Sequence, residues 1–263
     1  MTAAHKILNP ERGDKVPPGL CALAVMTKAP RAGKVKTRLT PPLTPEEAAA
    51  LNVCFLRDTT AAIMQTVAKG GAQGIGVFTP EGSEGAFAEI LPKQFDLVLQ
   101  RGDAFGERLI AAAKDIFALG FNSLCLIDSD SPTVPLAAYT LAVQKLARSE
   151  PTSVLGPSDD GGYYLIGLNR MHLRVFEEIG WSTERVLEQT VQRAKESGLP
   201  MEFLPTWFDV DDRATLRRLC NELLGDPEGP SSAGYAAPET KGFLEQLIAR
   251  EGRERIWPTD VAK

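Results

Sequence analysis

Histidine is scarce in this chain, whose 263 residues include only His5 and His172. A Ser-His-Asp hydrolase needs a histidine base and many zinc sites need histidine ligands, so both classes are poorly supported. Cysteine is also sparse. The four cysteines, at positions 21, 54, 125 and 220, form no Cys-x-x-Cys pair, and three lie in apolar or helix-like stretches. This usage is typical of buried thiols in a reducing cytoplasm, where we expect the protein to act.

The chain also lacks an excess of basic residues and long apolar runs. Its 29 Lys and Arg residues are outnumbered by 34 Asp and Glu residues, which gives a net charge of -5. This balance argues against a nucleic-acid partner or an anionic membrane surface. No apolar run approaches the roughly 20 residues of a membrane span, and residues 1–19 do not resemble a secretory signal. The chemistry must therefore rest on carboxylates, lysines, arginines and a metal.

Two aspartates follow an apolar run near the middle of the chain. The run 124–127 is typical of a buried parallel strand, and Asp128 and Asp130 come directly after it. In extended backbone both side chains point to one side, at the strand end where α/β sheets bind ligands. Two close carboxylates repel each other, and Mg²⁺ or Mn²⁺ prefers such oxygen ligands. The pattern predicts a metal site for a phosphorylated ligand; the alternative is a loop with two solvated acids.

A cluster of cations follows the first expected strand, residues 20–26. The segment from Thr27 to Leu39 contains no acid and carries five cations: Lys28, Arg31, Lys34, Lys36 and Arg38. Gly33 allows the backbone to approach a ligand closely. The loop lacks the glycine spacing of a Walker A motif, but a diphosphate or triphosphate suits its charge. We therefore predict phosphate binding here, with a solvated basic loop as the alternative.

Two glycine-containing turns are further candidates. Gly102, in the turn 100–108, allows backbone to pass close to a nucleotide, although turn geometry alone also explains it. In the turn 156–162, Asp159 or Asp160 can meet a sugar hydroxyl or the metal. Gly161 and Gly162 line the same turn or serve only its geometry.

A second Asp-x-Asp motif, residues 209–211, follows the last expected strand. Its repetition at a second strand end supports the metal site. Either Asp211 or Asp212 should instead cap the helix expected at 213–224, because aspartate is a preferred N-cap residue.

The remaining pattern alternates strands with helices, which predicts one α/β domain. Thr44, Asp103 and Ser182 are expected to cap the helices that follow them. Further strands are expected at 74–79, 96–99, 152–155, 163–168 and 201–206, and further helices at 45–67, 83–91, 136–148 and 243–250. We expect an N-terminal extension at 1–19, a transferase domain at 20–224, and a Gly/Pro-rich linker with a short helix at 225–263. This helix packs back on the domain or across a homodimer.

The order of several motifs carries a family resemblance. The motifs are Lys28-Ala-Pro, Gly33-Lys-Val-Lys-Thr-Arg-Leu39, Gly106-Glu-Arg108, Asp128-Ser-Asp-Ser-Pro132, the stretch 156–168, Trp181-Ser-Thr183 and Asp209-Val-Asp211. Over residues 20–220 they resemble the GT-A, or nucleotide-diphospho-sugar transferase, superfamily. Within it, the chain is most similar to the bacterial family labelled glycosyltransferase that includes members near arsenosugar pathways. Relatives often carry Gly or Thr in place of Asp128, and Thr in place of Asp212.

The resemblance implies a three-layer α/β/α fold with a mixed, mostly parallel sheet. Lys28, Lys36 and Arg38 would hold phosphates, with Gly33, Gly102 and Asp128 beside the nucleotide. Asp128, Asp130 and Asp211 would hold Mg²⁺ or Mn²⁺, and Asp160, Gly161 and Gly162 would line the sugar or acceptor side.

The leading hypothesis is a metal-dependent transferase that moves the sugar of a nucleotide-diphospho-sugar to a small acceptor. Lys36 and Arg38 would stabilise the leaving pyrophosphate, and Asp160 would deprotonate the acceptor hydroxyl. One alternative is a nucleotidyltransferase, similar to guanylyltransferases, that joins a nucleoside triphosphate to a phosphorylated small molecule. Another is a non-catalytic nucleotide-binding module. A haloacid-dehalogenase-type phosphatase is disfavoured, because Pro132 stands where that motif normally has Thr or Val.

Overall fold

A seven-stranded sheet forms the centre of the computed structural model, which describes residues 5–225 and 234–257. The strands are β1 (Cys21–Lys28), β2 (Ala72–Thr79), β3 (Asp96–Leu99), β4 (Ser123–Ile127), β5 (Ser153–Pro157), β6 (Tyr163–Leu168) and β7 (Met201–Phe203). Their order is β3-β2-β1-β4-β6-β5-β7. β6 runs antiparallel to its neighbours β4 and β5, and the other pairings are parallel. The predicted mixed, mostly parallel sheet is therefore confirmed.

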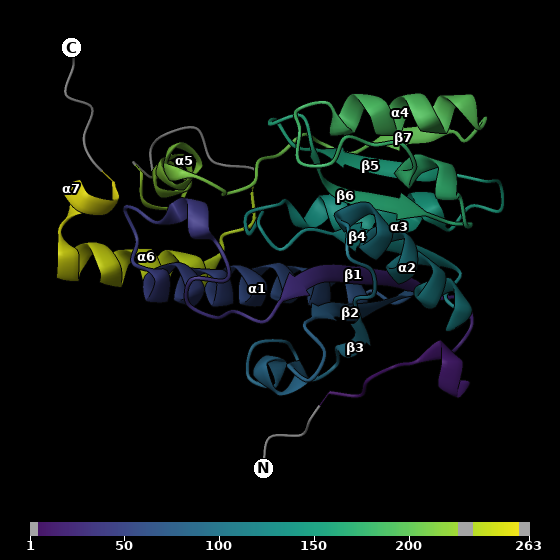
Figure 1. The fold of residues 1–263 in the computed structure, drawn as a ribbon, viewed down its shortest axis with the longest axis horizontal. Coiled ribbons are helices and arrows are strands. Elements are labelled where there is room, and N and C mark those ends of the chain that lie inside the picture. The colour runs from purple at the N-terminus through teal and green to yellow at the C-terminus, as the bar shows by residue number, and fades with distance from the viewer. Residues whose placement is uncertain (1–4, 226–233, 258–263) are drawn as a thin grey trace.

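Helices cover both faces of the sheet (Figure 1). α1 (Pro45–Val67) and α3 (Leu136–Leu146) pack on one face, and α2 (Phe105–Ala118) and α4 (Val186–Glu196) on the other. Short 3-10 helices occur at η1 (Pro10–Arg12), η2 (Thr37–Leu39), η3 (Glu84–Phe87) and η4 (Leu173–Phe176). This arrangement is the three-layer α/β/α fold.

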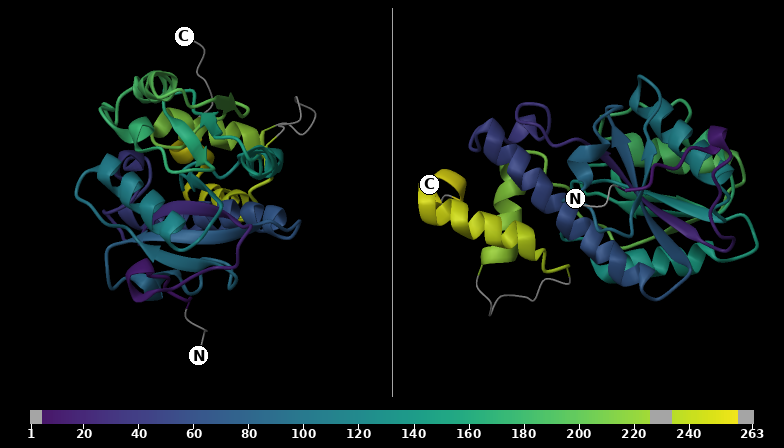
Figure 2. Two further views of the ribbon diagram at one scale, coloured as in Figure 1. Left: turned by 90° about the vertical axis from the view of Figure 1, so that its right-hand side faces the viewer. Right: turned by 90° about the horizontal axis from the view of Figure 1, so that it is seen from below.

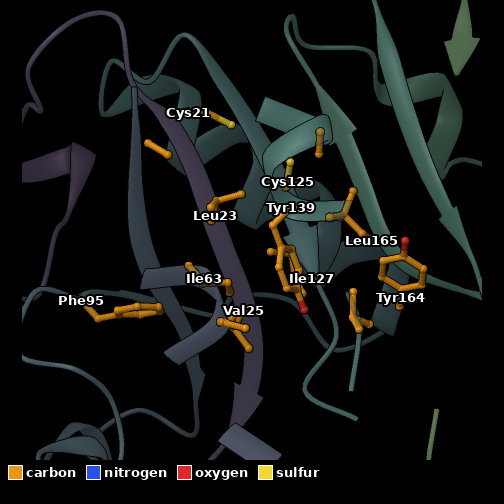
Figure 3. Close-up of a cluster of buried hydrophobic side chains, with 14 of the residues drawn as sticks. Cys21, Leu23, Val25, Ile63, Phe95, Cys125, Ile127, Tyr139, Tyr164 and Leu165 are labelled. Carbon is orange, nitrogen blue, oxygen red and sulfur yellow. The ribbon is translucent and has the colours of Figure 1, made fainter. Parts of the chain in front are cut away.

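The alternation of side chains along β1 explains the two apolar layers. Cys21, Leu23 and Val25 face the layer under α1 and α3, whereas the alanines between them face the opposite layer. Figure 3 shows the first layer, in which Ile63 of α1 and Tyr139 of α3 meet side chains of β1, β4 and β6. A strand buried on both faces needs the continuous apolar run that the sequence contains here.

The C-terminal helices pack beside the sheet rather than on it (Figure 2). α5 (Arg213–Leu224), α6 (Pro238–Glu251) and α7 (Arg253–Ile256) form a third apolar cluster with the first half of α1 and with η2. α6 lies against α1, which is one of the two arrangements expected for the C-terminal helix. Leu39 of η2 is fully buried in this cluster, so the C-terminal helices anchor the end of the basic loop. Part of the expected linker, residues 226–233, lies outside the described residues.

Two predicted helix caps are wrong. α2 begins at Phe105, and the Glu107 carboxylate reaches back to accept the N–H groups of Asp103 and Ala104, at 3.0 and 3.1 Å. A glutamate at the third helical position can cap in this way, so Asp103 is not needed. α4 begins at Val186 instead of directly after Ser182. Ser182 therefore lies outside the helix, in the loop before it.

No helix in the described part of the chain is long and apolar enough to cross a membrane. The four cysteines are buried and unbridged.

Candidate functional site

Four loops meet at one edge of the sheet, and the strand directions explain why. β1, β4, β5 and β7 end at this edge, and the antiparallel β6 begins there. Backbone hydrogen bonds join the loops: Val210 N donates to Asp130 O at 2.9 Å, and Asp159 N donates to Trp207 O at 3.0 Å. The first of these bonds places the two Asp-x-Asp motifs side by side. Ligands of open α/β sheets bind at this edge.

Lys36 lies between the two acidic motifs. Its Nζ is 2.7 Å from Asp130 Oδ1 and 3.0 Å from Asp211 Oδ1, and it donates to the Val210 carbonyl at 2.8 Å. The side chain is only 5% exposed. Burial alone would lower the pKa of Lys36, but attraction to Asp130 and Asp211 outweighs burial and raises that pKa. Lys36 therefore stays an ammonium ion that two carboxylates share.

Asp211 is free to face Lys36 because its neighbour caps the helix. Asp212 Oδ1 accepts the N–H of Thr215 at 2.9 Å, which makes it the N-cap of α5 and lowers its pKa. Asp211 also forms an ion pair with Arg38, whose side chain is 73% exposed. The sequence left the cap open between these two aspartates, and the structure assigns it to Asp212.

A basic pocket of about 260 Å³ lies under the loop after β1. It is lined by Lys28, Lys34, Lys36, Arg38, Asn52, Ser129, Asp130 and Asp211, among others. Lys36 and Arg38 are paired with carboxylates, but within the described residues no acid pairs with Lys28 or Lys34. Two unpaired ammonium groups facing one pocket suit the oxygens of a phosphate chain.

A second pocket, of about 620 Å³, adjoins the basic one and shares Arg38, Asp130 and Asp211 with it. Further carboxylates line it, namely those of Asp128, Asp160, Glu184 and Asp209. Its wall also contains the aromatic side chains of Phe105, Tyr163, Tyr164 and Trp181. Carboxylates that accept hydroxyl groups, beside aromatic faces, suit a polyhydroxylated ligand.

Two of these carboxyls have raised pKa values. Burial and the negative charge of Asp160 and Asp211 raise the pKa of Asp209 to about 6. Burial and the nearby Asp130 raise the pKa of Asp128 well above its usual range, although Ser131 Oγ donates to Asp128 at 2.7 Å. Such an acidic pocket favours a bound cation, which would relieve the repulsion.

The turn between β5 and β6 separates its two aspartates. Asp159 is drawn to Arg218 of α5 by an ion pair, whereas Asp160 lines the acidic pocket. Asp160 Oδ1 accepts the Gly162 N–H at 2.8 Å, which orients the carboxylate. Gly161 has φ +90°, and a Cβ there would collide with the Glu184 carbonyl. Of the two candidates, Asp160 is therefore the one that lines the acidic pocket, and its contact with a sugar hydroxyl or a metal stays a prediction.

Gly33 and Gly102 line neither pocket. A Cβ at Gly102 would press against Glu107, so its role in the fold is close packing of the turn before α2. Gly33 has φ +69° and lies in the turn of the basic loop. Nucleotide contact by these two glycines stays a prediction.

The donor set fits a divalent cation in part. Oxygens of Asp130 and Asp211 converge on one cationic group, the Lys36 ammonium. Within the described residues, no three His, Cys, Asp or Glu side chains are grouped to hold a metal. Metal binding by Asp128 beside Asp130 and Asp211 stays a prediction. Mg²⁺ is commonly bound by one or two carboxylates together with substrate phosphates and water, which matches the pair seen here.

Four residues that line the acidic pocket were not among the site residues predicted from the sequence. Asp209 belongs to the second Asp-x-Asp motif and was a visible candidate. Ser182 was predicted to cap a helix and belongs, with Trp181, to one of the motifs that carry the family resemblance. Phe105 and Trp181 are distant in sequence, and nothing in their local pattern indicates that they meet.

Comparison with known proteins shows what the chain as a whole is similar to. A protein from Desulfovibrio desulfuricans G20, described as a proposed nucleotide-diphospho-sugar transferase, is 28% identical. The match covers 90% of this chain and 99% of that protein, with a TM-score of 0.73. The chain therefore has the fold of the nucleotide-diphospho-sugar transferases, and the resemblance of its motifs to that superfamily is confirmed.

A family model described as "Uncharacterized protein conserved in bacteria (DUF2064)" matches residues 62–183. CMP:2-keto-3-deoxy-manno-octonic acid synthetase, in a complex with CTP, shares the fold alone, at 10% identity and a TM-score of 0.50. That match covers 76% of this chain and 96% of the synthetase. No curated protein sequence matches the chain. Of these matches, the Desulfovibrio desulfuricans protein is similar enough to support more than the fold, and it supports a nucleotide-binding transferase.

Proposed function

We propose that this protein transfers the glycosyl group of a nucleotide-diphospho-sugar to a small acceptor in a metal-dependent reaction. The observation that carries the proposal is the pair of joined pockets with opposite character. The basic pocket suits a diphosphate, the acidic and aromatic pocket suits a sugar, and Arg38, Asp130 and Asp211 lie where they meet.

Lys28 and Lys34, which pair with no acid in the described part of the chain, supply ammonium groups for the outer phosphate oxygens. Lys36 and Arg38 hold the oxygens nearest the sugar, where negative charge grows as the bond between sugar carbon and phosphate oxygen breaks. Asp130 and Asp211 would hold Mg²⁺ or Mn²⁺, which supplies positive charge to the leaving diphosphate when bound.

Asp160 is the proposed base for the acceptor. Its carboxylate lines the acidic pocket and is oriented by the Gly162 N–H. The acceptor hydroxyl gives its proton to Asp160 as its oxygen bonds to the sugar carbon, and the nucleoside diphosphate leaves.

The second candidate is a nucleotidyltransferase, which the four cations of the basic pocket favour because a triphosphate carries more charge than a diphosphate. Such an enzyme also needs a site for a phosphorylated second substrate. Among the described residues that line the acidic pocket, Arg38 is the single cation, and it is already paired with Asp211. This charge distribution favours glycosyl transfer.

A ligand panel separates the two candidates. Thermal unfolding is followed with nucleoside triphosphates, nucleoside diphosphates and nucleotide-sugars, each with Mg²⁺, Mn²⁺ or EDTA. Ligand at 100 times its dissociation constant stabilises by about 2.7 kcal/mol, which shifts the unfolding temperature visibly. A metal-dependent shift with a nucleotide-sugar supports glycosyl transfer, and one confined to a triphosphate supports nucleotidyl transfer.

Asp130→Asn should abolish the metal dependence of this shift. The matched control is Asp159→Asn, because Asp159 pairs with Arg218 and does not line either pocket. Unchanged metal dependence in Asp130→Asn would contradict the metal assignment.

A further inference from the structure

The loop 181–184 lines the acidic pocket and packs against the turn that carries Asp160. Two glycines allow it to pack this closely. A Cβ at Gly106 would collide with the Trp181 indole nitrogen, and a Cβ at Gly161 would collide with the Glu184 carbonyl. Leu187 N donates to Gly161 O at 2.8 Å and ties the start of α4 to the same turn. The loop is therefore held in place from both sides.

Trp181 presents an aromatic surface at the mouth of this pocket. Its ring packs edge-to-face on Phe105, with the centroids 5.3 Å apart. Phe105 is one of few large apolar side chains left exposed, at 42%, and both rings line the pocket. Trp181 is half-buried, with part of its ring packed against the apolar core and part facing the pocket. Aromatic rings that line a pocket beside carboxylates are typical of a ligand-binding wall.

Ser182 has an unusual conformation for its residue type. Its φ is +64°, in the left-handed region that glycine favours, and its side chain is exposed and lines the pocket. Within the described residues the Ser182 hydroxyl forms no hydrogen bond, whereas the neighbouring Thr183 hydroxyl donates to the Gly180 carbonyl at 2.6 Å. Strained backbone of this kind collects at functional sites.

We propose that Trp181 and Ser182 bind the sugar ring of the donor. The indole covers a C–H face of the ring, and the Ser182 hydroxyl hydrogen-bonds to a ring hydroxyl. This inference rests on the proposed function, because the phosphates must occupy the basic pocket for the sugar to reach this wall. It names two sugar-binding residues beyond the turn that contains Asp160.

Two substitutions at Ser182 separate the hydroxyl from the backbone. Ser182→Ala removes the hydroxyl and keeps the strain, whereas Ser182→Gly removes both. The probes are UDP-glucose, ADP-glucose, dTDP-glucose and GDP-mannose, each beside its nucleoside diphosphate, with Mn²⁺, in calorimetric titrations. Both variants should bind the nucleotide-sugar about fivefold more weakly, the typical loss for one hydrogen bond. Their affinity for the matching nucleoside diphosphate should stay at the wild-type value.

Trp181→Phe supplies an independent readout. A nucleotide-sugar should change the tryptophan fluorescence of the wild-type protein more than its nucleoside diphosphate does. This difference should vanish in Trp181→Phe, which retains Trp207 and Trp257 as internal references.

The outcomes distinguish two failures. In the first, a nucleotide-sugar binds, but all three variants keep the wild-type ratio of nucleotide-sugar affinity to nucleoside diphosphate affinity. Trp181 and Ser182 then do not bind the sugar, and the proposed function stands. An equal loss of affinity for both ligands would also contradict sugar binding by these residues, because it would mean that the substitutions disturb the loop in general. If no probe binds the wild-type protein, the proposed function fails and the inference fails with it.

Discussion

Replacing Lys36 by methionine tests the charge arrangement on which the site depends. Methionine keeps an unbranched apolar chain near the Phe55 ring, whose centroid is 5.5 Å from Nζ, but removes the ammonium group. Asp130 and Asp211 then face each other without their shared cation. We expect the folded protein to lose stability.

The structure sets the size of this loss. Removing one partner of a buried ion pair costs about 3–5 kcal/mol. The side chains of Asp130 and Asp211 are 35% and 27% exposed, and Arg38 still contacts Asp211. We therefore expect a smaller loss of stability, about 2–3 kcal/mol. At roughly 2–4 °C per kcal/mol for a chain of this size, the unfolding temperature should fall by about 5–10 °C.

The same variant should respond more strongly to Mn²⁺. In the wild type a metal ion competes with an ammonium group already bonded to both carboxylates; in Lys36→Met it meets no competitor. Unfolding is measured by circular dichroism with Mn²⁺ or EDTA. Lys145→Met is the matched control, because it breaks an ion pair with Glu202 far from the site and should gain no Mn²⁺ response. Wild-type stability and an unchanged Mn²⁺ shift in Lys36→Met would refute the reasoning.

Three further predictions concern the scaffold. Asp58 is fully buried and accepts two backbone N–H groups at the start of α6, at 3.1 and 2.7 Å, so Asp58→Ala should cost about 1–2 kcal/mol in urea unfolding. Burial alone would raise the pKa of Glu47, but hydrogen bonds from an arginine of α7 and from the backbone outweigh it and lower the pKa. Glu47 thus stabilises the fold above its unfolded pKa of about 4.3, and this contribution is lost as pH falls through the lower folded pKa. Unfolding measured over a pH series should show a shallower acid-induced loss in Glu47→Gln. Gly161→Ala should displace the loop at the Glu184 carbonyl and weaken nucleotide-sugar binding more than nucleoside diphosphate binding, measured by calorimetry.

Local chemistry explains why many elements were predictable. The strand at 96–99 and the helix at 213–224 have the predicted bounds, because the polar Asp96 and Gln100 flank the apolar run of the first and Asp212 caps the second. The last strand ends at Phe203 rather than at residue 206. Leu204 N still donates to Leu155 O at 2.8 Å, but Pro205 has no N–H to continue the ladder.

The site was predictable motif by motif, but its internal pairing was not. Each Asp-x-Asp motif and the basic loop could be placed at strand ends from the sequence. That Lys36 lies between Asp130 and Asp211 depends on a backbone bond between loops far apart in the chain. The motif Trp181-Ser-Thr183 was visible in the sequence, but its position beside Phe105 was not, because the Trp181 ring packs where Gly106 of α2 has no side chain.

The opposite charges of the two motif types explain both the fold and the proposed chemistry of this edge. The five cations of the basic loop repel one another, and so do the two aspartates of each acidic motif. In the free protein they neutralise one another through Lys36 and Arg38, so the folded edge is stable without a ligand. A phosphate chain that binds Lys36 and Arg38 must therefore take them from the two carboxylates. Those carboxylates then need a new cation, which is the physical reason to expect that a divalent metal and the diphosphate bind to this protein together.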